Sequence, residues 1–237
     1  MSISVHHLTK TYGSQKALDN ISFETDSNHI IGFLGPNGAG KSTTMKILTG
    51  ILPIETGQCL VRNIDLQSHP QEVKKIIGYL PENNPLYLDM YIREILQYEA
   101  HVQHIPNSKK RIAEVIELTG LQDEQYKKVQ QLSKGYRQRV GLAMAIIHDP
   151  HVLILDEPTS GLDPNQILEI RTLIKQLSQK KTVLLSTHIM QEVEAICEEI
   201  IVIAKGTIRD HFLKADMADK YPNKSMEEVF VELTKVT

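Results

Sequence analysis

The sequence of 237 residues has no tryptophan, only two cysteines and no long apolar segment. Cys59 and Cys197 lie far apart and cannot form a framework of disulfides, which favours a reducing compartment. The longest apolar run, residues 140–147, has eight residues, whereas a membrane-spanning helix needs about 20. We therefore expect any membrane-spanning part of the assembly to come from another chain.

Neither sign of charge dominates the sequence. It has 26 Lys and Arg residues against 29 Asp and Glu residues, a formal net charge of -3. Because nucleic-acid binders usually carry a basic surface, no nucleic-acid partner is expected. The first seven residues lack a charged segment followed by an apolar one, so we expect no secretory signal there.

The order of apolar segments predicts an α/β fold with a largely parallel sheet. The expected strands are at residues 3–20 (two strands with a turn), 30–34, 56–64, 152–155, 182–186 and 200–204. The expected helices are at residues 42–48, 91–102, 111–120, 133–148, 165–179 and 190–198, with a turn-interrupted helix at 216–237.

Residues 35–42 read Gly-Pro-Asn-Gly-Ala-Gly-Lys-Ser and lie between a predicted buried strand and a predicted helix, which fits G-x-x-x-x-G-K-[ST]. Glycines let the backbone approach phosphates, Lys41 neutralises the β- and γ-phosphate oxygens, and the Ser42 hydroxyl can ligate Mg²⁺. The alternative, a chance glycine-rich turn, does not explain the flanking strand and helix. The residues of this loop expected to bind nucleotide are Gly35, Pro36, Asn37, Gly38, Ala39, Gly40, Lys41, Ser42 and Thr43.

The predicted strand at 152–155 is followed by two carboxylates, Asp156 and Glu157. Ligands of an open α/β sheet bind beyond the carboxyl ends of the strands, so these side chains would lie near the phosphates. Asp156 is a candidate Mg²⁺ ligand through water, and Glu157 is placed to act as a general base on an attacking water. A solvated strand end explains the pair taken alone, but a nucleotide site explains it better beside the phosphate loop.

From about residue 3 to residue 208, the motifs resemble those of the ATP-binding subunits of ABC transporters. The family's LSGGQ signature is similar to residues 132–136, its D-loop to residues 160–163, and its switch histidine to His188. Tyr12 matches the aromatic residue that stacks on adenine. Residues 77–87 and 132–143 are most similar to the subunit associated with bacterial gliding motility, within the exporter type.

The resemblance implies a P-loop NTPase fold with a mixed sheet core, an antiparallel β subdomain and a helical sublobe. It places the ATPase domain at residues 1–210, the sublobe at about 84–148 and a short C-terminal extension at 211–237. It also implies an ATPase that closes as a pair of identical copies around two ATP–Mg²⁺. This pair would drive separately encoded transmembrane permease subunits of an exporter, from the cytoplasmic face of the cell membrane.

The resemblance further assigns roles to single residues. Ser133 and Gly135 would bind the γ-phosphate of a nucleotide held by the partner copy, whereas by residue type alone Ser133 is an ordinary helix N-cap. His188 would contact the γ-phosphate or the attacking water and act with Glu157 in catalysis. Glu82 stands where the family usually has glutamine, and a carboxylate is still a good ligand for a hard cation. The expected metal ligands are Ser42, Glu82 and Asp156.

Two residues of the signature also depart from the family pattern. Lys134 stands where the signature has a glycine, and Tyr136 where it has a glutamine. Because an extra cation near the γ-phosphate could help binding, we do not interpret the departure as an inactive site. The resemblance implies that Asp163 couples two copies of the chain, whereas its place before a proline fits a helix N-cap, and it could do both.

Two other functions are compatible with parts of the sequence. A soluble ABC ATPase acting on ribosomes or nucleic acid usually carries two cassettes or long coiled-coil insertions, and neither fits within 237 residues. A regulatory module without turnover is disfavoured by the presence of Lys41, Asp156, Glu157 and His188. The apolar stretch at 86–91 fits core packing, or, by the resemblance, a groove for a helix of a membrane subunit.

Overall fold

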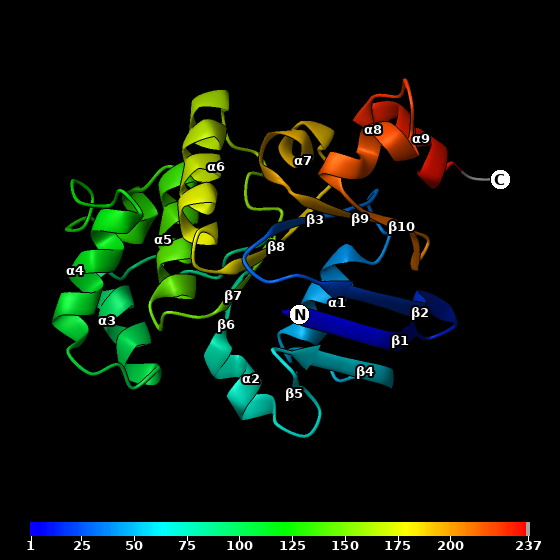
Figure 1. Ribbon diagram of the computed structural model, residues 1–237. Coiled ribbons are helices and arrows are strands. Elements are labelled where there is room, and N and C mark those ends of the chain that lie inside the picture. The colour runs from blue at the N-terminus through cyan, green and yellow to red at the C-terminus, as the bar shows by residue number, and fades with distance from the viewer. Residues whose placement is uncertain (236–237) are drawn as a thin grey trace.

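A computed structural model describes residues 1–235 as two sheets flanked by helices (Figure 1). The first sheet has four antiparallel strands in the order β2–β1–β4–β5. Their bounds are Gln15–Thr25, Ile3–Tyr12, Thr56–Val61 and Ile64–Asp65. The second has six strands in the order β10–β9–β3–β8–β7–β6, and only the β9–β10 pair is antiparallel. Their bounds are Thr207–Leu213, Glu199–Ala204, Ile30–Leu34, Thr182–Thr187, Val152–Asp156 and Ile77–Leu80.

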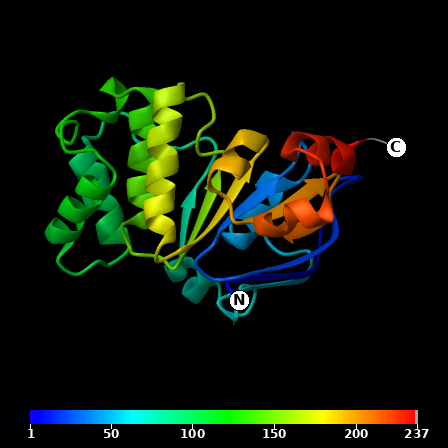
Figure 2. The ribbon, with the colours of Figure 1, turned by 45° about the horizontal axis from the view of Figure 1, so that its top comes forward.

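The helices gather in groups around the six-stranded sheet. Figures 1 and 2 show α3, α4 and α5 at one end of the molecule and α8 and α9 at the opposite end. The α-helices are α1 Lys41–Leu48, α2 Pro70–Ile76, α3 Ile92–Val102, α4 Ser108–Leu118, α5 Lys134–Ile146, α6 Pro164–Ser178, α7 Met190–Ile196, α8 Met217–Lys220 and α9 Met226–Thr234. Two short 3₁₀ helices cover Val129–Gln131 and Lys214–Asp216. Within residues 1–235, no helix has the length and apolar character needed to cross a membrane.

The six-stranded sheet is buried on both faces, and β3 shows how the sequence achieves this. Ile31 and Phe33 belong to a core cluster shared with the four-stranded sheet and α1. Ile30 and Leu34 belong to a second cluster shared with the helices of the other face. Because successive side chains of a strand point to opposite faces, a strand covered on both sides must be apolar throughout. The apolar segments at 30–34 and 152–155 meet this requirement, and both strands were predicted.

The expected single strand at residues 56–64 is instead a hairpin. The strand β4 ends at Val61 and β5 begins at Ile64. Between them, Arg62 and Asn63 have φ values of 49° and 63°. Two consecutive residues with positive φ form the kind of tight turn that joins antiparallel strands, and asparagine tolerates this conformation.

Two strands and one helix were missing from the sequence prediction. The strand β6 has only four residues, too few to show a periodicity, and α2 before it has seven. The strand β10 carries Arg209, Asp210 and His211 in its middle and lies at the edge of the sheet, where polar side chains reach solvent. The predicted domain boundary at residue 210 falls inside β10 and stays a prediction.

Several predicted ends were shifted. The helix α4 begins at Ser108 rather than Arg111, and α7 ends at Ile196 because Cys197 is extended. The C-terminal segment contains two helices, α8 and α9, separated at 221–225 by a stretch with a proline and the positive φ of Asn223. The last two residues of the helix predicted at 216–237 lie outside the described residues.

Candidate functional site

Three loops with functional motifs meet at one edge of the six-stranded sheet. The strands β3, β8 and β7 are parallel neighbours, so their carboxyl ends lie side by side. In this register Leu34 pairs with Thr187, and Asp156 pairs with Ser186. The phosphate loop follows β3, the carboxylate pair ends β7, and His188 follows β8. The sheet therefore brings together the motifs that the sequence singled out, as expected for an open α/β fold.

The phosphate loop turns sharply into the first turn of α1. Gly40 is the N-cap of α1 and has a φ of 112°, a conformation that other residues rarely adopt. A Cβ atom on Gly40 would also lie 2.8 Å from the carbonyl oxygen of Ala17, so a larger residue would displace the backbone. Lys41 follows, with 6% of its surface exposed, and its ammonium donates to the carbonyl of Gly35 at 2.8 Å and of Pro36 at 3.3 Å.

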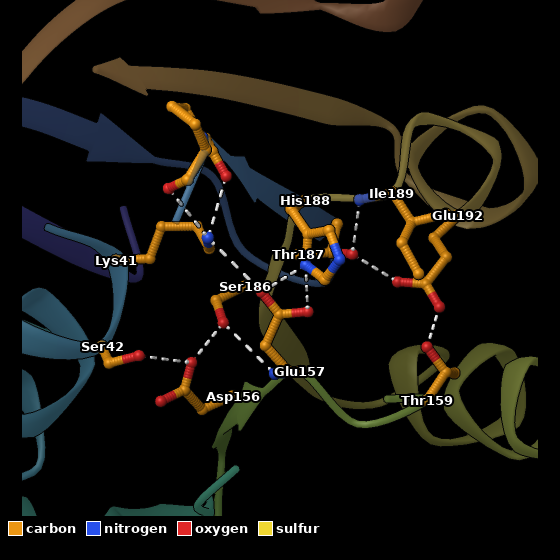
Figure 3. Close-up of polar contacts among 12 residues, drawn as sticks. Lys41, Ser42, Asp156, Glu157, Thr159, Ser186, Thr187, His188, Ile189 and Glu192 are labelled. Atoms are coloured by element: carbon orange, nitrogen blue, oxygen red, sulfur yellow. Dashed lines mark hydrogen bonds and ion pairs between the residues drawn. The ribbon is translucent and has the colours of Figure 1, made fainter. Parts of the chain in front are cut away.

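The Asp156 carboxylate lies behind the phosphate loop and is 1% exposed. Its Oδ1 atom accepts from the Ser42 hydroxyl at 3.3 Å and also accepts from the Ser186 hydroxyl (Figure 3). A buried carboxylate is stable only when such donors satisfy it. Ser42 and Asp156 thus present hydroxyl and carboxylate oxygens at one point, and hard cations such as Mg²⁺ prefer oxygen ligands.

The Glu157 carboxylate lies between the Lys41 ammonium and the His188 imidazole. Its Oε1 atom lies 3.4 Å from the Lys41 ammonium, and its Oε2 atom lies 2.9 Å from Nδ1 of His188. The backbone N–H of Glu157 donates to the carbonyl of Ser186 at 3.1 Å. Its φ of 50° places a non-glycine residue in the left-handed region, which costs about 1–3 kcal/mol. Such strain is common at functional sites, where the surroundings fix one orientation of a side chain.

Lys41, Ser42, Glu157 and His188 face a cavity of about 570 Å³, whereas Asp156 is buried behind Ser42 and is not part of the lining. It is lined by Tyr12, Gln15, Ala17, Asn37, Gly38, Ala39, Gly40, Lys41, Ser42, Thr43, Glu82, Glu157, Ser160 and His188. Tyr12 is 48% exposed and lies at the border of the cavity with solvent. The two predicted residues Gly35 and Pro36 contribute carbonyl groups that hold Lys41.

Two predicted residues lie elsewhere in the molecule. Within the described part of the chain, Ser133 and Gly135 do not line this cavity; they form the start of α5. Ser133 is the N-cap of α5, and its hydroxyl accepts from the N–H of Tyr136 at 3.4 Å. A Cβ atom on Gly135 would lie 2.6 Å from the side chain of Gln166. The capping role of Ser133 foreseen from its residue type is therefore present.

The sequence prediction missed several residues of the site. Gln15 and Ala17 line the cavity because the β1–β2 hairpin passes beside the phosphate loop. Ser186 holds both Asp156 and Glu157, although it lies about 30 residues further along the chain. Its place directly before the Thr-His pair at 187–188 was the only sequence signal. Ser160 was noted as part of a motif but not as a residue lining this cavity.

Comparisons with known proteins agree with this geometry. The ABC transporter family matches residues 18–160. The bacitracin transport ATP-binding protein BcrA of Bacillus licheniformis is 39% identical over 208 residues, which cover 87% of this chain and 68% of that protein.

Solved structures agree as well. A structure of an ATP-binding subunit of an ABC transporter superimposes with a TM-score of 0.88 at 27% identity, over 99% of this chain and 100% of that chain. The dimeric cassette MJ0796, in a post-hydrolysis state bound to ADP and Pi, superimposes with a TM-score of 0.81 at 26% identity. The match covers 89% of this chain and 98% of that chain. The chain therefore belongs to the ABC transporter family, as an ATP-binding subunit with ATPase activity and the P-loop fold of ABC cassettes.

Proposed function

We propose that two copies of this chain close around two ATP–Mg²⁺, hydrolyse ATP and thereby drive separately encoded transmembrane subunits of an exporter. The observation that carries the proposal is the convergence of Lys41, Ser42, Glu157 and His188 on one cavity, with Asp156 hydrogen-bonded to Ser42 behind it. Each of these side chains has the chemistry that phosphoryl transfer to water requires.

The proposed chemistry follows from the contacts of Glu157. Its carboxylate is the general base that orients and deprotonates the attacking water, an effect worth about 10²–10⁴ in rate. The Lys41 ammonium, which lies 3.4 Å from Glu157, would turn to the β- and γ-phosphate oxygens when ATP binds. His188, which contacts Glu157 through Nδ1, would then hold the γ-phosphate or the water beside the base. Tyr12 at the rim of the cavity would stack on adenine.

Magnesium fits the oxygen atoms of this site. Ser42, Asp156 and Glu82 offer a hydroxyl and two carboxylates, and Mg²⁺ is usually held by one or two carboxylates together with water and substrate phosphates. Across residues 1–235, no group of three or more His, Cys, Asp or Glu side chains is placed to hold a metal alone, which agrees with a cation brought by ATP. When bound, Mg²⁺ would neutralise negative charge that develops on the phosphates.

The second copy of the chain would complete each site. Ser133 and Gly135 lie at the N-terminus of α5, a helix of 13 residues whose positive end attracts anions. They would bind the γ-phosphate of the nucleotide held by the partner copy. Asp163 caps α6 through its contacts with the N–H groups of Asn165 and Gln166, both 3.0 Å long, and would also face the partner. The dimeric state of MJ0796 supports this arrangement.

The surface that we propose for the membrane subunit lies next to Glu82. Tyr87, Leu88 and Tyr98 are exposed by 56%, 49% and 48%. Nearby, a second cavity of about 540 Å³ is lined by Ile51, Pro85 and other residues on both sides of the Glu82 loop. A helix of a membrane subunit could bind there and hold the chain at the cytoplasmic face of the membrane. Movement of Glu82 with ATP would reach such a helix directly.

The direction of transport and the physiological role rest on resemblance. Bacitracin transport by the relative BcrA supports the exporter assignment. The proposed link to gliding motility rests on the similarity of residues 77–87 and 132–143 alone.

The proposal is tested by capturing the assembly. A tagged Glu157→Gln variant, expressed in the native host with ATP and Mg²⁺, should stay closed, and detergent extracts should contain a stoichiometric multi-span membrane protein. A Lys41→Ala, Glu157→Gln double variant is the matched control, because it should not close on ATP. Co-purification of ribosomes, nucleic acid or cytosolic proteins alone would contradict the transporter assignment in favour of a soluble ATPase.

A further inference from the structure

A buried carboxylate joins two of the catalytic loops on the side away from the nucleotide cavity. Glu192, on α7, is 1% exposed. Its Oε2 atom accepts from the Thr187 hydroxyl at 2.6 Å, and its Oε1 atom accepts from the Thr159 hydroxyl. Figure 3 shows the Glu192 carboxylate lying between the two threonines. Each oxygen of one carboxylate is therefore hydrogen-bonded to a different loop.

The two threonines lie next to the residues that carry the chemistry. Thr187 precedes His188, and its hydroxyl also accepts from the N–H of Ile189 at 3.0 Å, which fixes the backbone on the far side of His188. Thr159 lies two residues after Glu157 and directly before Ser160, which lines the cavity. Within the described residues, Thr159 and Thr187 share no direct hydrogen bond, so Glu192 alone joins them.

Two other sets of contacts join these loops. At their base, the Glu157 N–H donates to the Ser186 carbonyl and to the Ser186 hydroxyl. Toward the cavity, His188 Nδ1 lies 2.9 Å from Glu157 Oε2. That contact must change when the nucleotide and water engage either side chain. Within residues 1–235, Glu192, Thr159 and Thr187 are buried and do not line the cavity, so the contact through Glu192 can persist while the His188–Glu157 contact changes.

A carboxylate is a costly way to fill this position. Burial raises the pKa of Glu192, and the nearby Glu157 carboxylate raises it further. The Thr187 hydroxyl, Arg171 on α6 and His188 oppose this rise in the pKa of Glu192. Burial also raises the pKa of the Cys197 thiol, and the Glu192 carboxylate raises it further. An apolar side chain would pack here without a desolvation penalty. The penalty is understandable if the two hydrogen bonds of Glu192 serve catalysis.

We propose that Glu192 is a positioning residue that holds the Glu157 and His188 loops at a fixed distance, so that the general base and the histidine are aligned together. In the described part of the chain Glu192 does not line the cavity, so it would act through the two loops rather than on the nucleotide or the water. The inference rests on the proposed roles of Glu157 and His188 in ATP hydrolysis.

The test measures kcat and KM for ATP in a set of variants at a temperature well below their melting temperatures. Thr159→Val and Thr187→Val each remove one hydroxyl at nearly constant volume. Each should lower kcat about tenfold, the effect of losing one hydrogen bond to a charged group, and change KM less than about twofold. The double variant should have about the same kcat as the slower of the two single variants, because either change alone breaks the same connection.

Two variants at position 192 complete the set. Glu192→Leu should be about tenfold slow in kcat, and within it the two threonine changes should have no further effect. Glu192→Gln should keep at least about half of wild-type kcat, because its amide can accept from one hydroxyl and donate to the other. Thr119→Val is the control: it is a buried threonine whose hydroxyl donates to the Val115 carbonyl at 2.7 Å in the helical lobe. Its kcat should be unchanged.

Two results would overturn the inference. One is a double variant whose loss of kcat is the product of the two single losses. The other is a further loss of kcat when Thr159→Val or Thr187→Val is added to Glu192→Leu. Changes in melting temperature without changes in kcat would also overturn it, since they indicate a purely structural role. The kcat values of Glu157→Gln and His188→Ala, measured in the same experiment, show whether the role of Glu192 alone is wrong or the proposed function is wrong as well. If both keep wild-type turnover, the proposed function fails as well; if both are slow, only the role of Glu192 is refuted.

Discussion

Ser186 holds the two carboxylates of the site together, so its removal should weaken both the fold and the site. Its hydroxyl is fully buried, donates to Asp156 and accepts from the Glu157 N–H at 3.2 Å. Ser186→Ala removes only this hydroxyl. The Glu157 N–H keeps its second acceptor, the Ser186 carbonyl at 3.1 Å. Among residues 1–235, however, Asp156 keeps only the Ser42 hydroxyl at 3.3 Å as a side-chain donor.

The size of the effect follows from the loss of one hydrogen bond to a charged group. Such a bond contributes about 1.5–3 kcal/mol to the free energy of unfolding. For a chain of this length, each 1 kcal/mol shifts the melting temperature by about 2–4 °C. Ser186→Ala should therefore melt about 3–12 °C below the wild type.

Thermal melting and urea unfolding at neutral pH, without nucleotide, measure this loss. Ser178→Ala is a suitable control, because Ser178 is only partly buried and, within residues 1–235, its hydroxyl donates only to the Lys175 carbonyl at 2.9 Å. It should change the free energy of unfolding by less than about 0.5 kcal/mol. If Ser186→Ala is as stable as Ser178→Ala, the hydroxyl does not support Asp156 and the geometry described for the carboxylate pair is wrong.

Three further predictions concern single side chains. Lys41→Ala should weaken ATP binding at least about tenfold in titration calorimetry, while Lys46→Ala on the same helix should not; equal affinities would contradict the phosphate-loop assignment. Tyr12→Ala should weaken ATP binding by about 1–3 kcal/mol through lost stacking on adenine, and Tyr12→Phe should bind normally; a loss in both would point to the hydroxyl instead. Burial lowers the pKa of His148 from its ordinary value of 6.5, and its Nδ1 has no hydrogen-bond partner within residues 1–235. The unfolded chain therefore binds the proton more readily than the folded protein, so the wild type loses stability as the pH falls below 6.5. The melting temperature of wild type minus that of His148→Gln should therefore shrink between about pH 8 and about pH 5.5, and a constant difference would contradict the sign.

Local sequence patterns were enough to predict the fold class and the phosphate loop. The apolar segments at 30–34 and 152–155 are typical of strands covered on both faces, and the glycine-rich loop between strand and helix allows few conformations. Parallel pairing then places Asp156 and His188 at the same edge, because strand ends of a parallel sheet coincide. The convergence of the main motifs was therefore predictable without knowledge of the contacts.

The supporting contacts were not predictable, because they depend on which distant segments meet. Ser186 reaches Asp156 across 30 positions of the chain, and Thr159 reaches Glu192 across 33. Serine and threonine are common in all environments, so nothing in their local sequence marks these contacts. The strand β10 was missed for a related reason: its polar middle is stable only because β9 lies on one side and solvent on the other.

The turnover of Glu157→Gln tests most sharply whether Glu157 is the general base for ATP hydrolysis, as we propose. Glutamine keeps the size of the side chain and a contact with His188 but cannot accept a proton from water. We expect unchanged ATP affinity and a kcat lower by at least about a hundredfold. Near-normal turnover with normal affinity would contradict it and assign the proton transfer to another group.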